Sequence, residues 1–267
     1  MLYQLSYTPR ASAADRRSAH ATQPRRSTTL CRGRSLPTYR AMSVRPAPID
    51  PATLLMAYRS GIFPMADSIH DDEVFWVEPR ERAIIPLDGF RCSRSLAKTL
   101  KQDRFEVRCD TAFGDVMAAC AAPRSDDSGS WISDRIRASY GELHRRGHAH
   151  SIECWRDGEL VGGLYGVAFD RVFCGESMFS RMPNASKVAV AWLVAAMQEA
   201  GYALLDCQFM TDHLASLGAV ELPQRSYVAM VADATGETAC SLPEAVRRFQ
   251  VDSSPGKLIA QSFTQTS

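Results

Sequence analysis

Apolar and polar positions follow two different periods along this chain, and the changes of period divide it into predicted helices and strands. Apolar residues recur at helical spacing before residue 147, and two short apolar runs between them have the character of strands. Ser93 has the side chain preferred at a helix N-cap, and Gly61 is expected to end the first helix, with Phe63-Pro64 as a breaker. The predicted helices are 51–58, 93–101, 111–121 and 133–146, and the predicted strands are 75–77 and 83–85.

The stretch after residue 147 is the most regular part of the chain. It predicts three strands at 150–154, 160–169 and 171–179, the first two joined by a hairpin turn at Asp157-Gly158. Asn184 is then expected to cap a helix of about fifteen residues that closes at Gly201. A buried strand (203–209) and a short helix (211–217) follow. This order predicts an α+β fold, and it resembles the Gcn5-related N-acetyltransferase (GNAT) fold.

The two ends of the chain differ in composition from its middle. Residues 1–46 are rich in Arg, Ser, Thr and Ala without apolar periodicity, which indicates a disordered tail. It is interpreted as a start-codon error, with translation beginning at Met42, or as a targeting peptide. The remainder is predicted to form a small N-terminal domain (47–80) packed on a GNAT-like domain (81–235), with a loosely packed C-terminal tail (236–267).

Charge is distributed unevenly. Residues 1–46 carry nine Arg and one acidic residue, which leaves 22 basic and 29 acidic residues, a charge of −7, in the rest. A nucleic-acid partner would therefore have to bind a local basic patch. None of the eight cysteines forms a CxxC pair, which favours reduced thiols and a cytoplasmic location. Because no apolar run approaches the ~18 residues that a membrane span needs, a soluble protein without membrane contact is expected.

A polar pair ends the predicted strand at 203–209. Asp206 and Gln208 are two residues apart, so they point to one face of the strand while Cys207 points to the other. A carboxylate and an amide at the end of a buried strand need hydrogen-bond partners. The pair is therefore either structural, bound to the N-terminus of a neighbouring helix, or functional.

Eight short runs together resemble the leucyl/phenylalanyl-tRNA–protein transferase family over residues 50–230. Their order and spacing are specific, because no common structural unit requires this set. The runs are LMAYRSGIFP (55–64), GHAHSIE (147–153), VGGLYGV (161–167), FCGESMFSR (173–181), ASK (185–187), DCQ (206–208), DH (212–213) and SLGA (216–219).

The resemblance implies that Asp206 and Gln208 form the catalytic pair of an aminoacyl transfer. Gln208 is expected to accept a hydrogen bond from the incoming α-amine, while Asp206 orients Gln208 and favours deprotonation of the amine. Glu176 is expected to contact the acceptor peptide, and its carboxylate suits an N-terminal Arg or Lys. Glu176, Met178 and Ser180 alternate along the predicted strand and should share one face. The structural alternative for Glu176 is a solvated salt bridge at a sheet edge.

The resemblance also assigns residues to the donor. The pocket for the transferred side chain is expected to comprise Phe173, Met178, Leu164, Leu205, Leu193 and Ser180, although apolar residues in such runs are usually plain core. Leu164 and Leu193 stand where Met and Phe are usual in the family, which bears on the choice among Leu, Phe and Met. The tRNA 3′ end is expected to contact Trp131, Met65 and Thr211.

Within that 3′-end set, Trp131 is expected either as an exposed indole that stacks on the terminal adenine or as a Trp that closes the domain interface. Met65 replaces the family's usual Trp and is expected to weaken stacking. Arg94, Lys98 and Lys101 form one stripe on a helix, which is either a solvated face or a contact for the tRNA backbone.

The remaining expectations concern metals, cofactors and partners. His144, His148 and His150 are clustered but lack further ligands at zinc spacing, so they are interpreted as structural, with no metal. No cofactor is expected, because the donor ester is already activated. The expected partners are aminoacyl-tRNA and proteins with N-terminal Arg or Lys, and the protein is expected to be a monomer whose products enter the N-degron pathway.

Two alternatives remain: an acyl-CoA-dependent GNAT enzyme and a non-catalytic tRNA-binding module. The absence of glycine from 180–186 argues against the first, since such enzymes bind pyrophosphate on a Gly-rich loop. The acidic body and the set Asp206, Gln208 and Glu176 argue against the second.

Overall fold

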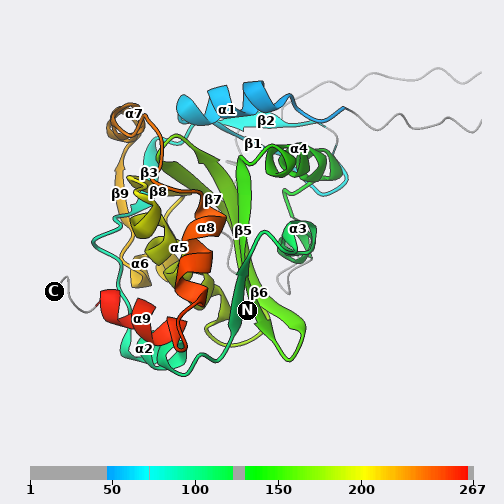
Figure 1. Cartoon of the computed structure of the whole chain (residues 1–267). Helices are drawn as coiled ribbons and strands as arrows, with labels where there is room; N and C mark the ends of the chain where they lie inside the picture. Colours follow the sequence, from blue (N-terminus) through cyan, green and yellow to red (C-terminus); the bar gives the residue numbers. More distant parts are fainter. Residues whose placement is uncertain (1–46, 72, 123–129, 264–267) are drawn as a thin grey trace, which may run out of the picture. The chain divides into compact units, whose positions relative to one another are not determined.

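The computed structural model describes residues 47–71, 73–122 and 130–263, which Figure 1 shows in colour. The expectations for residues 1–46 lie outside the described part of the chain. The helices are α1 (Pro51–Arg59), α2 (Arg94–Lys101), α3 (Phe113–Ala121), α4 (Asp134–Arg145), α5 (Ala185–Ala200), α6 (Asp212–Ser216), α7 (Gln224–Asp233), α8 (Leu242–Gln250) and α9 (Pro255–Ser262). The strands are β1 (Phe63–Met65), β2 (Phe75–Val77), β3 (Glu81–Ile85), β4 (Glu106–Cys109), β5 (Ala149–Arg156), β6 (Glu159–Phe169), β7 (Val172–Ser180), β8 (Leu204–Gln208) and β9 (Val220–Pro223).

A seven-stranded mixed sheet forms the centre of the fold. Its strand order is β4-β5-β6-β7-β8-β3-β9, and β1 and β2 form a separate two-stranded sheet. β7 and β8 are parallel, as the long crossover through α5 requires, and the other neighbours are antiparallel. The predicted combination of helices and strands is confirmed, and the sheet is mixed.

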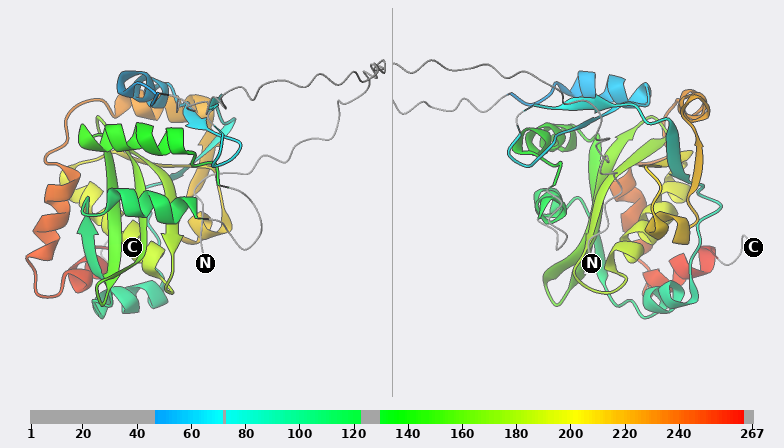
Figure 2. Two further views of the ribbon diagram at one scale, coloured as in Figure 1. Left: turned by 90° about the vertical axis from the view of Figure 1, so that its right-hand side faces the viewer. Right: turned by 180° about the vertical axis from the view of Figure 1, so that it is seen from behind.

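Helices cover both faces of this sheet. α5 packs on β5, β6 and β7 from one side, and α2, α8 and α9 pack against α5. α3 and α4 lie across the other face, as the left view of Figure 2 shows, and α1 packs against α4 and α7. Each side has its own apolar cluster, because side chains of one strand alternate between the two faces. None of the helices in these described ranges combines the length and apolar composition needed to cross a membrane.

Local signals located several element ends. The Ser93 side chain accepts a hydrogen bond from the Leu96 amide, as expected for an N-cap. Gly201 ends α5 with a positive φ of 77°. Asn184 is a correction: it stands at the N-cap position of α5 with φ 69°, but its side chain makes no capping bond. Its Nδ2 atom donates instead to Thr99 Oγ1 on α2, at 3.1 Å.

The C-terminal segment is a second correction. A loosely packed tail was expected, but the chain forms α8 and α9 there. Both helices bury apolar side chains in the cluster around α5, and these include Leu242, Val246 and Ile259. Ser241 is the N-cap of α8 and accepts from the Glu244 amide. The segment was underestimated because its apolar residues find their partners on α5, more than forty residues away in sequence.

Candidate active site

Two parallel strands separate beside the predicted catalytic residues. β7 and β8 are paired only at Val172–Leu204, Phe173–Leu205 and Cys174–Asp206. Beyond these pairs the connection runs through side chains, since Gln208 Nε2 donates to Glu176 Oε1 at 2.9 Å. The fork between the two strands therefore brings Asp206, Gln208 and Glu176 into one buried group.

A β-bulge determines where Glu176 points. Tyr165 pairs with Ser177 and Gly166 pairs with Gly175, so Glu176 is an extra residue in β7. Its side chain consequently enters the cluster under α1 and α4, whereas Met178 packs in the cluster around α5. The prediction that Glu176 shares a face with Met178 and Ser180 is wrong, because the bulge shifts the alternation by one residue.

The Glu176 carboxylate is fully buried and accepts hydrogen bonds from three side chains. Tyr58 donates to Oε1 at 2.7 Å and Tyr140 donates to Oε2 at 3.1 Å, in addition to Gln208. The two tyrosine hydroxyls also contact each other. Burial raises the pKa of Glu176 to about 7, although the hydrogen bonds from Tyr58 and Gln208 oppose this. Glu176 therefore changes charge near neutral pH.

One atom of the Gln208 side-chain amide, the carbonyl Oε1, makes no hydrogen bond with the described residues. Because Nε2 is bound to Glu176, the carbonyl Oε1 points elsewhere, and it is buried without a partner among the described residues. A buried acceptor without a donor is unfavourable unless a ligand supplies one. The backbone of Gln208 has φ 64°, a left-handed conformation, and its N–H donates to Asp206 Oδ1 at 2.8 Å.

Asp206 is held in a buried ion pair. Arg82 donates to Oδ1 through Nε at 2.8 Å and to Oδ2 through NH2 at 2.6 Å, and neither side chain is exposed. Tyr227 adds a hydrogen bond to Oδ2 at 3.2 Å. Burial lowers the pKa of the Arg82 guanidinium, but the Asp206 carboxylate more than offsets this and keeps that pKa above its ordinary value. Both carboxylate oxygens are thus occupied, and Asp206 orients Gln208 through its backbone N–H.

The cation of Arg82 also lies between two aromatic rings. Its guanidinium carbon is 4.9 Å from the centroid of Phe63 and 4.3 Å from that of Tyr227. NH1 donates to the carbonyl of Gly61 at 3.0 Å. Arg82 therefore ties the loop after α1 to the strand that carries Asp206.

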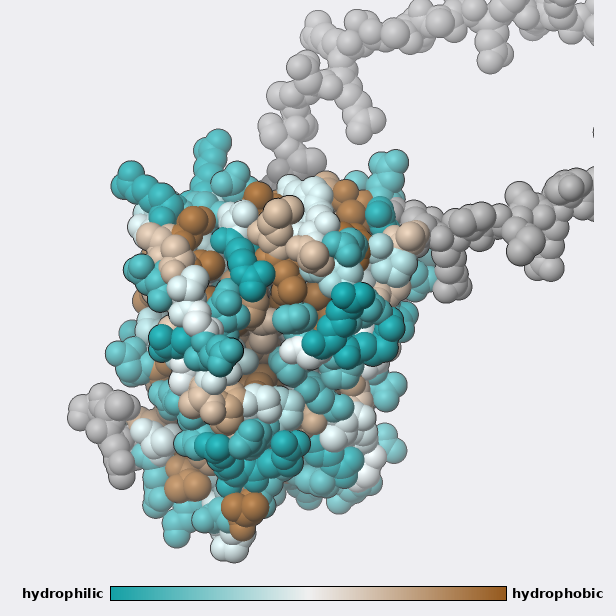
Figure 3. Space-filling model, turned by 45° about the horizontal axis from the view of Figure 1, so that its top comes forward, coloured by the Kyte–Doolittle hydropathy of each residue, from teal (hydrophilic) through white to brown (hydrophobic). Residues whose placement is uncertain are grey.

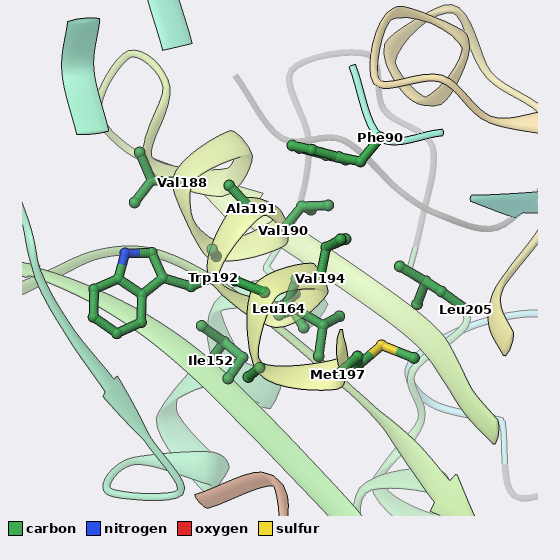
Figure 4. Close-up of a cluster of buried hydrophobic side chains, with 14 of the residues drawn as sticks. Phe90, Ile152, Leu164, Val188, Val190, Ala191, Trp192, Val194, Met197 and Leu205 are labelled. Carbon is green, nitrogen blue, oxygen red and sulfur yellow. The ribbon is translucent and has the colours of Figure 1, made fainter. Parts of the chain in front are cut away.

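The residues expected to surround the transferred side chain lie together, on the opposite face of the sheet from Glu176. Phe173, Met178, Leu164, Leu205 and Leu193 all belong to the buried cluster around α5. Figure 4 shows Leu164 and Leu205 near α5 within this cluster. All five are almost fully buried, so their own side chains fill this space. Ser180 lies at the end of β7, where its hydroxyl donates to the carbonyl of Met182 at 2.8 Å.

Two of the residues expected at the tRNA 3′ end are core residues. Trp131 is only 4% exposed and Met65 only 5%, and both belong to the cluster under α1, α3 and α4. Of the two alternatives for Trp131, the exposed indole is therefore wrong, because its side chain is buried in this cluster. Thr211 is the N-cap of α6 and accepts from the Leu214 amide at 3.2 Å.

Of the remaining predicted residues, the stripe on α2 lies at the surface and His150 is buried. Arg94, Lys98 and Lys101 are all exposed on α2, as the stripe requires. His150 Nδ1 donates to Asp110 Oδ2 at 2.7 Å, and the ring of His144 stacks on Phe113. The described residues contain no group of three or more His, Cys, Asp or Glu that could hold a metal ion.

The group around Glu176 and Asp206 includes residues that sequence reasoning missed. They are Tyr58, Tyr140 and Tyr227, which come from three different helices, and Arg82 from β3. Only Arg82 carried a local signal, as a charged residue directly before the apolar run 83–85. The tyrosines look like ordinary core residues, and their roles depend on the packing of α1, α4 and α7.

Comparison with known proteins gives one consistent family. Residues 84–232 match the model described as leucyl/phenylalanyl-tRNA protein transferase, and residues 47–80 match the model of its N-terminal domain. A protein of that name from Novosphingobium aromaticivorans is 54% identical over 260 residues, covering 84% of this chain and 99% of its own. One from Rhizorhabdus wittichii is 61% identical over 191 residues, covering 72% and 77%. The solved structure of L-PGS from Bacillus licheniformis is 12% identical with a TM-score of 0.32, covering 81% of this chain and 73% of its own.

Proposed function

This chain belongs to the leucyl/phenylalanyl-tRNA–protein transferase family, and from that premise we propose that it moves Leu or Phe, and also Met, from aminoacyl-tRNA to proteins with an N-terminal Arg or Lys. The observation that carries the proposal is the buried Oε1 atom of Gln208, which has no partner in the described structure and is aimed by Glu176. An acceptor α-amine supplies the N–H donor that this atom lacks.

The reaction needs orientation more than activation. The neutral α-amine attacks the ester carbonyl, a C–N bond forms, the bond to the tRNA 3′ oxygen breaks, and one amine proton passes to that oxygen. Gln208 Oε1 holds an N–H of the amine so that the nitrogen lone pair faces the carbonyl carbon. No covalent enzyme intermediate and no cofactor is required, because the ester carries the energy.

The neighbours of Gln208 have separate roles in this proposal. Glu176 sets the rotation of the amide by accepting from Nε2, and the tyrosines Tyr58 and Tyr140 hold Glu176. The Arg82–Asp206 pair holds the left-handed backbone of Gln208. Because Arg82 neutralises Asp206, the amine loses its proton to water and not to this carboxylate. Direct contact of Glu176 with a basic acceptor side chain requires one of the tyrosines to move.

Further features follow from the family resemblance and stay proposals. The crossover from β7 through α5 to β8 suits a GNAT-like domain over 81–235, with a separate N-terminal domain over 47–80. The cluster around α5 would open to admit the transferred side chain, and the stripe on α2 would contact the tRNA backbone. We also propose that the protein is a monomer in the cytoplasm and that its products are degraded through the N-degron pathway.

The test measures transfer of radiolabelled Leu from Leu-tRNA to a reporter protein that begins with Arg, by the chain beginning at Met42. Matched reporters beginning with Lys and with Ala serve as controls. Incorporation into the Arg and Lys reporters, and not into the Ala reporter, supports both the reaction and the acceptor rule. Absence of incorporation from Leu-tRNA, together with acylation of the reporters from acyl-CoA, would replace this proposal with the acyl-CoA-dependent alternative.

A further inference from the structure

A polar cavity lies at the N-terminus of α5, apart from the residues around Glu176. Its volume is about 330 Å³. The lining comes from the end of β7, the turn that follows, the first residues of α5 and one residue of α6: Ser180, Arg181, Met182, Pro183, Asn184, Ser186, Lys187 and His213. The transfer chemistry proposed at Gln208 does not use this space, although Ser180 was also expected in the pocket for the transferred side chain.

The lining is cationic and contains no carboxylate. Arg181 is held in place because NH1 donates to the carbonyl of Leu160 at 3.0 Å and the guanidinium lies over Phe179, 5.4 Å from the ring centroid. Lys187 is partly buried and makes no ion pair with the described residues. Burial and then the nearby Lys187 lower the pKa of His213 to about 4, so His213 stays neutral near pH 7. The fixed charges that face the cavity are therefore positive.

A helix terminus and a side-chain donor face the same space. The sixteen-residue helix α5 presents the positive end of its dipole there, while its first two N–H groups are bonded within the protein, that of Ala185 to the carbonyl of Met182 at 3.1 Å and that of Ser186 to Ser180 Oγ at 3.3 Å. Ser186 is 98% buried, since its exposed fraction is 2%, and its hydroxyl has no hydrogen-bond partner among the described residues. A helix N-terminus, an unused hydroxyl and an unpaired lysine in one hollow match the oxygens of a phosphate group.

The position in the fold connects this cavity to the proposed reaction. Ser180 ends β7, and α6 follows β8, so the cavity lies past the ends of the two strands that carry Glu176 and Gln208. On its other side, Asn184 is bonded to Thr99 of α2, the helix with the exposed stripe Arg94, Lys98 and Lys101. The cavity is thus placed between the fork and the stripe.

We propose that this cavity binds the phosphodiester that precedes the terminal adenosine of the donor tRNA. The inference rests on the proposed function, because it takes aminoacyl-tRNA as the donor. An aminoacyl ester beside Gln208 is joined through its ribose to that phosphate, and the remaining phosphates continue toward α2. Lys187 supplies the charge, the Ser186 hydroxyl supplies a donor, α5 contributes the positive end of its dipole, and Arg181 shapes the rim. The pyrophosphate of an acyl-CoA presents the same chemistry, so the experiment separates the two ligands.

The test compares binding of the trinucleotide CCA with that of an analogue whose last phosphodiester is a neutral methylphosphonate. Binding is measured by calorimetry on the full chain for the unmodified protein, for Lys187→Gln and for Arg225→Gln. Arg225 is an exposed cation on α7, which packs on β3 and β9, and serves as the charge-matched control. Circular dichroism of both variants verifies the fold.

The expected result is that the neutral analogue binds about tenfold more weakly than CCA to the unmodified protein and to Arg225→Gln. Lys187→Gln should bind the two ligands nearly equally. Equal discrimination by Lys187→Gln and by the unmodified protein would overturn the inference, as would coenzyme A binding more tightly than CCA in a Lys187-dependent way. Because the readout is binding, this result is independent of turnover: Lys187-dependent discrimination without Leu transfer would refute the proposed reaction and leave the phosphate site standing.

Discussion

The buried pair of Arg82 and Asp206 makes the strongest stability prediction. Replacing Arg82 with Met keeps a long apolar side chain between Phe63 and Tyr227 but removes the charge. Asp206 is then a fully buried carboxylate whose remaining donors are the Tyr227 hydroxyl and the backbone N–H of Gln208. Removing one partner of a buried ion pair typically lowers the free energy of unfolding by about 3–5 kcal/mol, and the carbonyl of Gly61 loses its donor as well. Arg82→Met should therefore lose at least about 3 kcal/mol.

Urea unfolding followed by circular dichroism measures this loss, and the chain provides a matched control. Arg59 pairs with Asp170 at 3.0 Å, but the Arg59 side chain is 46% exposed. Arg59→Met should lower the free energy of unfolding by only about 0–1 kcal/mol, since solvent screens that pair. The double variant Arg82→Met/Asp206→Asn should recover part of the loss, because it no longer buries an unpaired charge. Equal losses for Arg82→Met and Arg59→Met, with no recovery in the double variant, would refute this view of the pair. Tyr227→Phe gives a milder test if Arg82→Met does not fold.

Three further predictions concern Glu176, the bulge beside it and the stripe on α2. The pKa of Glu176 in the folded state is raised to about 7 from 4.5, so the folded state retains a proton that the unfolded state releases. The free energy of unfolding should therefore fall by about 3 kcal/mol between pH 4.5 and 7, relative to that of Glu176→Gln. Parallel pH profiles of the two proteins would contradict this. A Cβ atom at Gly166 would lie 2.3 Å from the carbonyl oxygen of Cys174, so Gly166→Ala should lower the free energy of unfolding in urea by about 1–3 kcal/mol. The control is Gly141→Ala on α4, where nothing lies within 4 Å of the added Cβ atom, and it should be neutral or stabilising. Equal effects of the two substitutions would show that the bulge tolerates a side chain. Lys98→Glu/Lys101→Glu should weaken tRNA binding and reduce its salt slope by about 2 without changing amino-acid preference, and unchanged affinity in a filter-binding assay would reject the stripe as a tRNA contact.

The sequence predicted those parts of the fold that depend on local signals. Ser93 caps its helix, the Asp157-Gly158 hairpin joins β5 to β6, and Asp206, Cys207 and Gln208 alternate across β8 as expected. The prediction failed where long-range contacts decide. β4 pairs with β5 and β9 pairs with β3, and neither short strand has a strong pattern of its own.

The candidate site shows the same division. Asp206, Gln208 and Glu176 were predicted from the sequence and meet in one buried group, but the direction of Glu176 depends on a bulge that single-strand alternation does not reveal. Arg82 was missed because its partner is 124 residues away. The sequence left open whether Trp131 is exposed or closes an interface, and the structure buries it in the cluster under α1, α3 and α4.

Three large apolar side chains are exposed on α1 and β2: Met56, Phe75 and Trp76. Figure 3 shows hydrophobic groups among hydrophilic ones on the face toward which α1 lies.

The central claim is that Gln208 Oε1 receives the acceptor amine, and single-turnover transfer tests it most directly. Labelled Leu-tRNA and excess enzyme are mixed with a peptide that begins with Arg, and the rate of Leu-peptide formation is measured for the unmodified protein and for Gln208→Ala. The account predicts a rate at least about 100-fold lower for Gln208→Ala, with unchanged Leu-tRNA affinity and an intact fold. A rate within about threefold of the unmodified protein would contradict it.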